Sequence, residues 1–164
     1  MKMRIGVDPG TGDGAIAFLR EDLTAIRVFD MPVMALGGKH QQVNAAELAK
    51  IMSLILEGYE VQSSDCTVYI ERVHAMPGNG SVAMFNFGMS YGVVIGVCGA
   101  LKMPVVFVQP NAWKKAAGLI GKPKDASRSL AQQFYPELDL SLKKHVGRAD
   151  ALIIARMGFL YDKE

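Results

Sequence analysis

Residues 3–14, with the sequence MRIGVDPGTGDG, contain the features that decide the fold. The aliphatic residues around Gly6 predict a buried strand over residues 3–8, and this strand ends in the carboxylate of Asp8. The residues that follow are rich in Gly, Asp and Pro, which are typical of a tight turn with positive φ angles. The stretch therefore predicts an acidic side chain at the edge of a sheet.

The chain on either side of this turn predicts a mixed α/β sheet. We expect strands over residues 3–8, 15–20, 24–31, 67–72 and 105–108, with a loop around Gly37 and Gly38. We expect helices over residues 45–57, 81–101, 126–134 and 147–161, and another that begins at Pro110. The predicted fold is a sheet of about five strands, the first three antiparallel, flanked by helices in a single domain over residues 1–164.

Composition indicates a folded globular protein, because half of the 164 residues are hydrophobic and 21% are charged. We expect no signal peptide, and the apolar stretch from Gly92 to Leu101 is too short to span a bilayer. Cys66 and Cys98 have no metal-binding spacing. We interpret them as reduced, buried thiols of a cytoplasmic protein.

Positive charge is concentrated in one part of the chain. Residues 111–148 contain eight basic and three acidic residues, although the whole chain has a net charge of only +2. The basic residues are Lys114, Lys115, Lys122, Lys124, Arg128, Lys143, Lys144 and Arg148. A basic region beside an acidic one is typical of an enzyme that binds a polyanion and holds metal ions, although a solvated surface is the alternative.

Three carboxylates occupy positions where they could meet. Asp8 and Glu71 each end a predicted strand, and Asp150 lies in the first turn of the last helix, which Leu152, Ala155 and Phe159 would dock on the sheet. Mg²⁺ prefers such oxygen ligands, and a pair of ions can promote phosphodiester hydrolysis. Alternatively, each acid only caps a strand or helix. Asp13 and Asp30 are further acids, of which Asp13 is better explained as a turn residue.

The order of these motifs resembles the RuvC-type Holliday-junction resolvases of the RNase H-like superfamily. The similar segments are Ile5-Gly-Val-Asp-Pro-Gly-Thr, Tyr69-Ile-Glu-Arg-Val and Gly147-Arg-Ala-Asp-Ala-Leu-Ile-Ile-Ala. Two segments between them, Pro110-Asn-Ala-Trp-Lys-Lys and Gly121-Lys-Pro-Lys, are similar to the phage branch of that family. The resemblance is diffuse and extends over residues 3–160.

This resemblance implies a crossover-junction endodeoxyribonuclease that uses Mg²⁺, for which Mn²⁺ can substitute. It makes Asp8, Glu71 and Asp150 the metal ligands. The family usually has a fourth ligand three residues before the last one, where this chain has Gly147. His145 is the nearest catalytic candidate, and a surface residue is the alternative interpretation.

The resemblance also implies branched DNA as the partner, a homodimer, and a cytoplasmic location in a bacterial or phage-infected cell. Met76 would enter the junction as a wedge, and the basic residues named above would contact phosphates. Trp113 could stack on a base but is better explained as a core residue. Gly88, Gly92, Gly96 and Ala100 share one helix face, which would pack on the sheet or on a second subunit.

Other functions fit parts of the same pattern. The Asp-Pro-Gly-Thr-Gly turn also occurs in the ATP-binding actin and sugar-kinase superfamily, whose members close two lobes around the nucleotide. An RNA-processing or flap nuclease of the same fold would have the same three acids. A non-catalytic protein that binds branched DNA would differ from all of these by cutting no substrate in Mg²⁺ or Mn²⁺.

Overall fold

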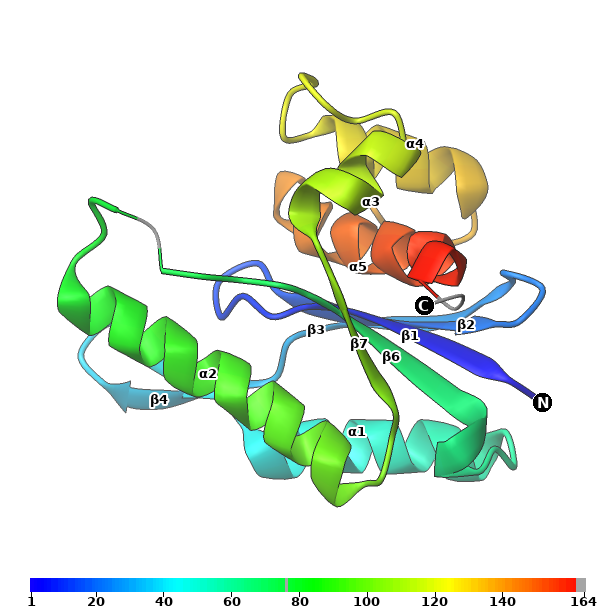
Figure 1. The fold of residues 1–164 in the computed structure, drawn as a ribbon, viewed down its shortest axis with the longest axis horizontal. Coiled ribbons are helices and arrows are strands. Elements are labelled where there is room, and N and C mark those ends of the chain that lie inside the picture. Colours follow the sequence, from blue (N-terminus) through cyan, green and yellow to red (C-terminus); the bar gives the residue numbers. More distant parts are fainter. Residues whose placement is uncertain (76, 162–164) are drawn as a thin grey trace.

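The protein has a mixed five-stranded sheet with helices on both faces (Figure 1). The structure is a computed structural model that describes residues 1–75 and 77–161, apart from the side chains of Phe159 and Tyr161. The strand order is β3 (Ala25–Asp30), β2 (Ala15–Arg20), β1 (Met3–Asp8), β6 (Cys66–Glu71) and β7 (Val105–Val108). The first three strands pair antiparallel, whereas β6 is parallel to both β1 and β7. The predicted fold class is therefore confirmed.

The helices lie in two layers, one on each face of the sheet (Figure 1). On the first face lie α1 (Ala45–Gly58) and α2 (Ser81–Ala100). On the second lie α3 (Pro110–Ala116), α4 (Ala126–Phe134) and α5 (Val146–Met157). Short 3₁₀ turns connect the larger elements at Ser63–Asp65, Lys143–His145 and Gly158–Tyr161. The Asn44 side chain accepts a hydrogen bond from the Glu47 backbone N–H and so caps α1, while Pro110 opens α3.

The structure departs from the predicted elements in two places, two unpredicted strands beside the expected loop and the end of the last helix. The region around Gly37 and Gly38 is the turn of a separate hairpin of β4 (Val33–Gly37) and β5 (His40–Val43), where both glycines have positive φ. These strands are short and largely exposed, so they have little of the buried alternation that identifies a strand. The last helix ends at Met157, four residues earlier than expected, and continues as a 3₁₀ turn.

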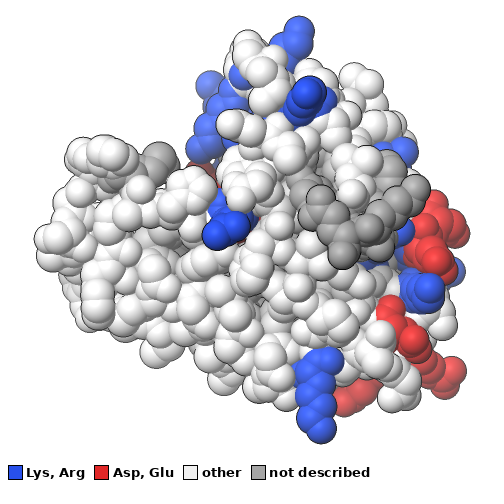
Figure 2. Space-filling view, in the orientation of Figure 1, with Lys and Arg blue, Asp and Glu red and all other residues white. Residues whose placement is uncertain are grey.

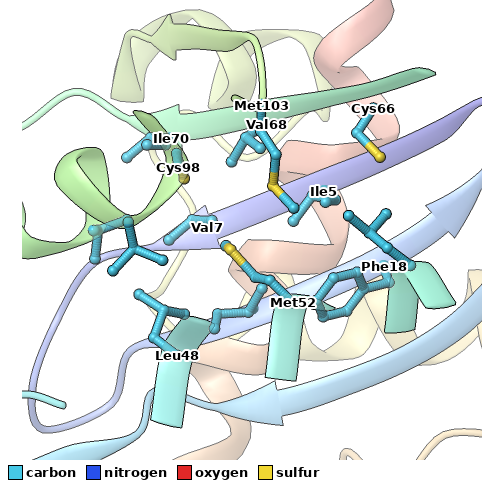
Figure 3. Packing of buried hydrophobic residues seen from close by; sticks show 14 of the residues in the cluster. Ile5, Val7, Phe18, Leu48, Met52, Cys66, Val68, Ile70, Cys98 and Met103 are labelled. Carbon is cyan, nitrogen blue, oxygen red and sulfur yellow. The ribbon is translucent and has the colours of Figure 1, made fainter. Parts of the chain in front are cut away.

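One hydrophobic core lies between the sheet and the α1–α2 layer (Figure 3). Ile5, Val7 and Phe18 extend from the sheet toward Leu48 and Met52 of α1, and all five are fully buried. Cys66 and Cys98 are buried free thiols in this same cluster, as expected from the sequence.

A second core lies between the sheet and α5, where backbone meets backbone. A Cβ atom on Gly6 would overlap the Ala151 carbonyl oxygen and would lie 2.6 Å from the Ala155 nitrogen. Glycine at position 6 therefore lets α5 lie directly on β1. The prediction that α5 docks through Leu152 and Ala155 is confirmed, since both are fully buried.

Helix α2 is longer and more apolar than the stretch singled out in the sequence. Its 20 residues would suffice to cross a membrane by length and composition, and 22% of its most apolar 18 residues are buried in the protein. However, α2 packs against α1 and β5, and Val94, Val97 and Cys98 belong to the first core. It therefore forms a layer of the fold, with one face left exposed.

The contact at Gly6 leads to a prediction for stability. Gly6→Ala should lower the melting temperature by several degrees, because the added methyl group forces α5 away from β1. Gly58→Ala is the matched control, since a Cβ atom there meets no atom within 4 Å. Thermal unfolding followed by circular dichroism measures both variants, and equal stability of the two would contradict the proposed contact.

Candidate metal centre

The sheet places Asp8 and Glu71 at the same edge. Val7 pairs with Ile70 in the parallel register of β1 and β6, and each strand ends at the next residue with one of the acids. Asp150 lies in α5, which the contact at Gly6 holds against β1. The three half-buried carboxylates therefore come from two neighbouring strand ends and the helix that crosses them.

Burial and mutual repulsion raise the pKa values of two of these acids, Asp8 and Asp150. Burial, with added repulsion from Asp150 and Glu71, raises the pKa of Asp8 to about 7. Burial also raises the pKa of Asp150 to about 6, an effect that repulsion from Glu71 increases. Lys124 lowers both values, and Lys114 lowers that of Asp150. Close carboxylates that resist ionisation in this way form an environment suited to a cation.

Neighbouring polar groups orient these carboxylates. The Gly10 N–H donates to Asp8 Oδ1 at 3.3 Å, and the Trp113 indole Nε1–H donates to Glu71 Oε2 at 2.7 Å. The buried Ser127 hydroxyl donates to the Lys124 carbonyl at 3.4 Å, and it also interacts with Asp150 and lowers the pKa of that carboxyl. The sequence analysis missed the roles of Trp113 and Ser127. The only sequence signal for Trp113 was its place in the Pro-Asn-Ala-Trp segment, in a helix that follows a buried strand.

The donor set fits a divalent cation in its chemistry, because all three groups are carboxylates that repel one another. Within residues 1–75 and 77–161, however, no three Asp, Glu, His or Cys side chains close around a single point. The three carboxylates are thus close enough to repel one another, but they do not surround a common point. An open set of this kind suits Mg²⁺, which keeps several waters and takes ligands from a bound phosphate.

The structure explains why Gly147 stands where a fourth ligand was expected. A Cβ atom at this position would overlap the carbonyl oxygen of Asp13, in the turn that follows β1. The turn and the start of α5 are therefore in backbone contact, and any side chain at 147 would separate them. Asp13 itself is a turn residue whose exposed carboxylate lies 4.0 Å from the Lys124 Nζ atom.

His145 is buried, so it is not the surface residue that was the alternative interpretation. Its polar neighbours are Leu142 and Asp139 and not the three carboxylates. Its Nδ1 atom accepts a hydrogen bond from the Leu142 N–H at 3.3 Å and lies 3.8 Å from Asp139 Oδ1. It also interacts electrostatically with Asp30 and Asp139. This arrangement favours a role in holding the start of α5.

Two of the residues predicted to contact phosphates, Arg128 and Arg148, make ion pairs within the protein. Arg148 makes a bidentate ion pair with Asp30, with distances of 2.6 and 2.9 Å, and this pair lowers the pKa of Asp30. Arg128 makes a similar pair with Asp125 and also donates to the Leu140 and Ser141 carbonyl groups. Internal ion pairs of this kind hold both guanidinium groups in place. The further acid Asp30 is thus the ion-pair partner of Arg148.

The six predicted lysines remain at the surface, on the side of the molecule formed by α3–α5. Figure 2 shows lysine and arginine side chains gathered around the upper part of the molecule, above the sheet. A cavity of about 490 Å³ beside Asp150 is lined by Lys114, Lys122 and Lys124. Lys115, Lys143 and Lys144 are exposed. Met76, the predicted wedge, lies outside the described residues.

Comparisons with known proteins agree with this geometry. No protein-family model matches the chain. An alignment of 90 residues, which covers 53% of this chain, is 38% identical to the chloroplastic Holliday junction resolvase MOC1 of Chlamydomonas reinhardtii, but it covers only 10% of that protein. Similar solved structures include T. thermophilus RuvC in complex with a Holliday junction substrate, with a TM-score of 0.66 and 17% identity over 99% of this chain and 96% of that one. Another is the Thermus thermophilus RuvC structure, with a TM-score of 0.59 and 15% identity over 98% and 95% of the two chains.

These matches confirm the resemblance that the sequence motifs predicted. The chain has the RNase H-like fold of RuvC over nearly its whole length. It also shares a segment with a junction resolvase at an identity well above that of the structural matches.

The raised pKa values lead to a prediction for stability without metal. The folded protein keeps the Asp8 proton up to about pH 7, whereas an unfolded chain loses it near 3.8. The folded state therefore binds more protons in this interval, and Asp8 makes the protein less stable as the pH rises through it. In EDTA, Asp8→Asn should raise the melting temperature by several degrees at pH 8 and by little at pH 4.5.

Thermal scans across this pH range test the prediction. Mg²⁺ should stabilise the wild-type protein more than Asp8→Asn at pH 8, because the variant lacks one carboxylate. A melting-temperature difference that stays constant from pH 4.5 to pH 8 would contradict the assigned pKa of Asp8.

Proposed function

We propose that this protein is a metal-dependent endonuclease that hydrolyses phosphodiesters at four-way DNA junctions. The observation that carries the proposal is the meeting of Asp8, Glu71 and Asp150 at one sheet edge of a RuvC fold, with lysines beside them. The similarity to a Holliday junction resolvase in sequence supports the same substrate. Other branched DNA remains within the proposed range of substrates.

Asp8, Glu71 and Asp150 would hold Mg²⁺, for which Mn²⁺ would substitute. The cation supplies charge neutralisation and an activated water for phosphodiester hydrolysis. The protein's own contribution is orientation: the Gly10 N–H and the Trp113 indole each fix one carboxylate. Lys114 and Lys124, which interact electrostatically with Asp150, would hold the scissile strand through its phosphates.

The surface lysines would set affinity more than sequence preference. Lys114, Lys122 and Lys124 surround the cavity next to Asp150, and Lys115, Lys143 and Lys144 extend the positive surface. Phosphate contacts of this kind release counterions, so binding should weaken steeply as salt rises. Arg128 and Arg148 would contribute less, because each already makes an ion pair within the protein.

We also propose a homodimer that is formed through the exposed face of α2. A Cβ atom on Gly88, Gly92 or Gly96 would meet no atom within 4 Å, so these glycines do not pack on the protein's own sheet. Phe85 and Val82 on the same helix are 67% and 60% exposed, and residues 81–100 contain no charged side chain. The corresponding side of the molecule in Figure 2 shows no charged atoms.

A second copy of this chain is the occupant that fits this face. Glycines in a helix interior cost up to about 1 kcal/mol each relative to alanine, and close helix packing offsets that cost. A two-fold interface would also supply two active sites for two symmetrical cuts in one junction. The buried free cysteines agree with a reducing location, which we propose to be the cytoplasm of a bacterial or phage-infected cell.

Junction cleavage tests the proposed activity. The wild-type protein should make paired nicks in an immobile four-way junction in Mg²⁺, whereas Asp8→Asn and Asp150→Asn should cut at least 100-fold more slowly, because each removes a ligand. Both variants should bind the junction in EDTA with near wild-type affinity. Glu57→Gln, on the opposite face of the sheet, is the matched control.

Linear duplex, flap and RNA–DNA hybrid substrates distinguish the alternatives. Preferred cutting of the flap or the hybrid would reassign the substrate while keeping the three-carboxylate site. No cutting of any substrate, with tight junction binding, would contradict the enzymatic proposal and favour a branched-DNA binder.

The dimer is tested by the same substitution at two exposed helix glycines. Gly92→Arg should convert a dimer to a monomer in sedimentation velocity, because it places a bulky charge on the proposed interface. Gly58→Arg on α1 should leave the dimer intact, since Gly58 lies on another helix and is equally open. A monomeric wild-type protein at tens of micromolar, or a dimeric Gly92→Arg variant, would contradict the assigned interface.

A further inference from the structure

Trp113 is a fully buried residue that reaches the edge of the metal centre. It lies in α3, directly after the strand β7, and is packed in the core between the sheet and α5. Its indole Nε1–H donates to Glu71 Oε2 at 2.7 Å, across 42 residues of sequence. It is also the single tryptophan in the chain.

The chemistry of this hydrogen bond suits a carboxylate that must still bind a cation. An indole N–H is a neutral donor with no acceptor function, so it occupies one lone pair of the carboxylate and leaves its charge in place. A lysine or arginine at the same point would neutralise Glu71 and compete with a cation. The Oε1 atom and the remaining lone pair of Oε2 therefore stay available.

The surroundings of the ring hold this donor in one orientation. Fully buried Val108 and Leu152 belong to the same core cluster, which limits rotation of the indole. Lys114 places its Nζ atom 5.4 Å from the centre of the ring. The same lysine acts electrostatically on Asp150, so α3 connects to two of the three acids.

We infer that Trp113 is a positioning residue that fixes Glu71 in the orientation required for cation binding. This inference rests on the proposed metal-dependent function. It implies that loss of the indole N–H lowers metal affinity without removing a metal ligand. Hydrogen bonds of this kind to ligating groups typically change metal affinity about 10–100-fold.

Two variants remove the donor in different ways. Trp113→Phe keeps an aromatic ring but leaves space in the core. Because the chain has one tryptophan, biosynthetic replacement by β-(3-benzothienyl)alanine changes only position 113, and it exchanges N–H for sulfur at nearly constant volume. Leu140→Ala, in the same core cluster, is the control for loss of packing alone.

The readouts are Mn²⁺ affinity without DNA, from electron paramagnetic resonance of the free ion, and the Mg²⁺ dependence of junction cleavage. Both donor-free proteins should bind Mn²⁺ about tenfold more weakly or worse, and should need correspondingly more Mg²⁺, with a smaller effect on the rate at saturating metal. Leu140→Ala should lower the melting temperature but keep wild-type Mn²⁺ affinity.

The single indole N–H resonance of the wild-type protein gives a measurement that needs no variant. Titration with Mg²⁺ should move this signal with the same midpoint as metal binding. Wild-type Mn²⁺ affinity in the benzothienyl protein, or an indole signal that Mg²⁺ leaves unchanged although the metal binds, would overturn the role of Trp113 alone. A wild-type protein that binds neither ion would overturn the metal-dependent function as well.

Discussion

The backbone contact between α5 and β1 is the constraint on which the functional site depends. Gly6 has no side chain because the Ala151 carbonyl occupies that space, and Gly147 has none because the turn after β1 passes against it. These two contacts fix the helix in both position and rotation. Asp150 consequently reaches the strand ends that carry Asp8 and Glu71, although it lies far from both in sequence.

This arrangement concentrates negative charge at a point where burial already disfavours it. Burial first, and repulsion between the acids second, raises the pKa of Asp8 to about 7 and that of Asp150 to about 6, so the charged acids are costly here. Such a cost is characteristic of functional sites, because a bound cation can offset it. The surrounding lysines also offset this cost, but more weakly than a cation would. Because they line the cavity next to Asp150, the acidic centre lies within a positively charged surface.

Much of the fold and three site residues could be predicted from sequence because they depend on local patterns. Buried strands that end in Asp8 and Glu71 are visible as apolar runs closed by an acid, and the motif order suggested Asp150. The partners of these acids could not be predicted, because they depend on packing between distant elements. Trp113 was recognised as a core residue but not as a donor to Glu71. Arg128 and Arg148 counted as free charge in the sequence, whereas the fold pairs them with Asp125 and Asp30.

The most direct test of this account is the anomalous diffraction of crystals soaked in Mn²⁺. The account predicts a peak between the carboxylates of Asp8, Glu71 and Asp150, at the edge where β1 and β6 end beneath α5. Peaks confined to other acidic side chains, or no peak at this edge at saturating Mn²⁺, would contradict the claim that the packing of α5 on β1 builds a metal centre.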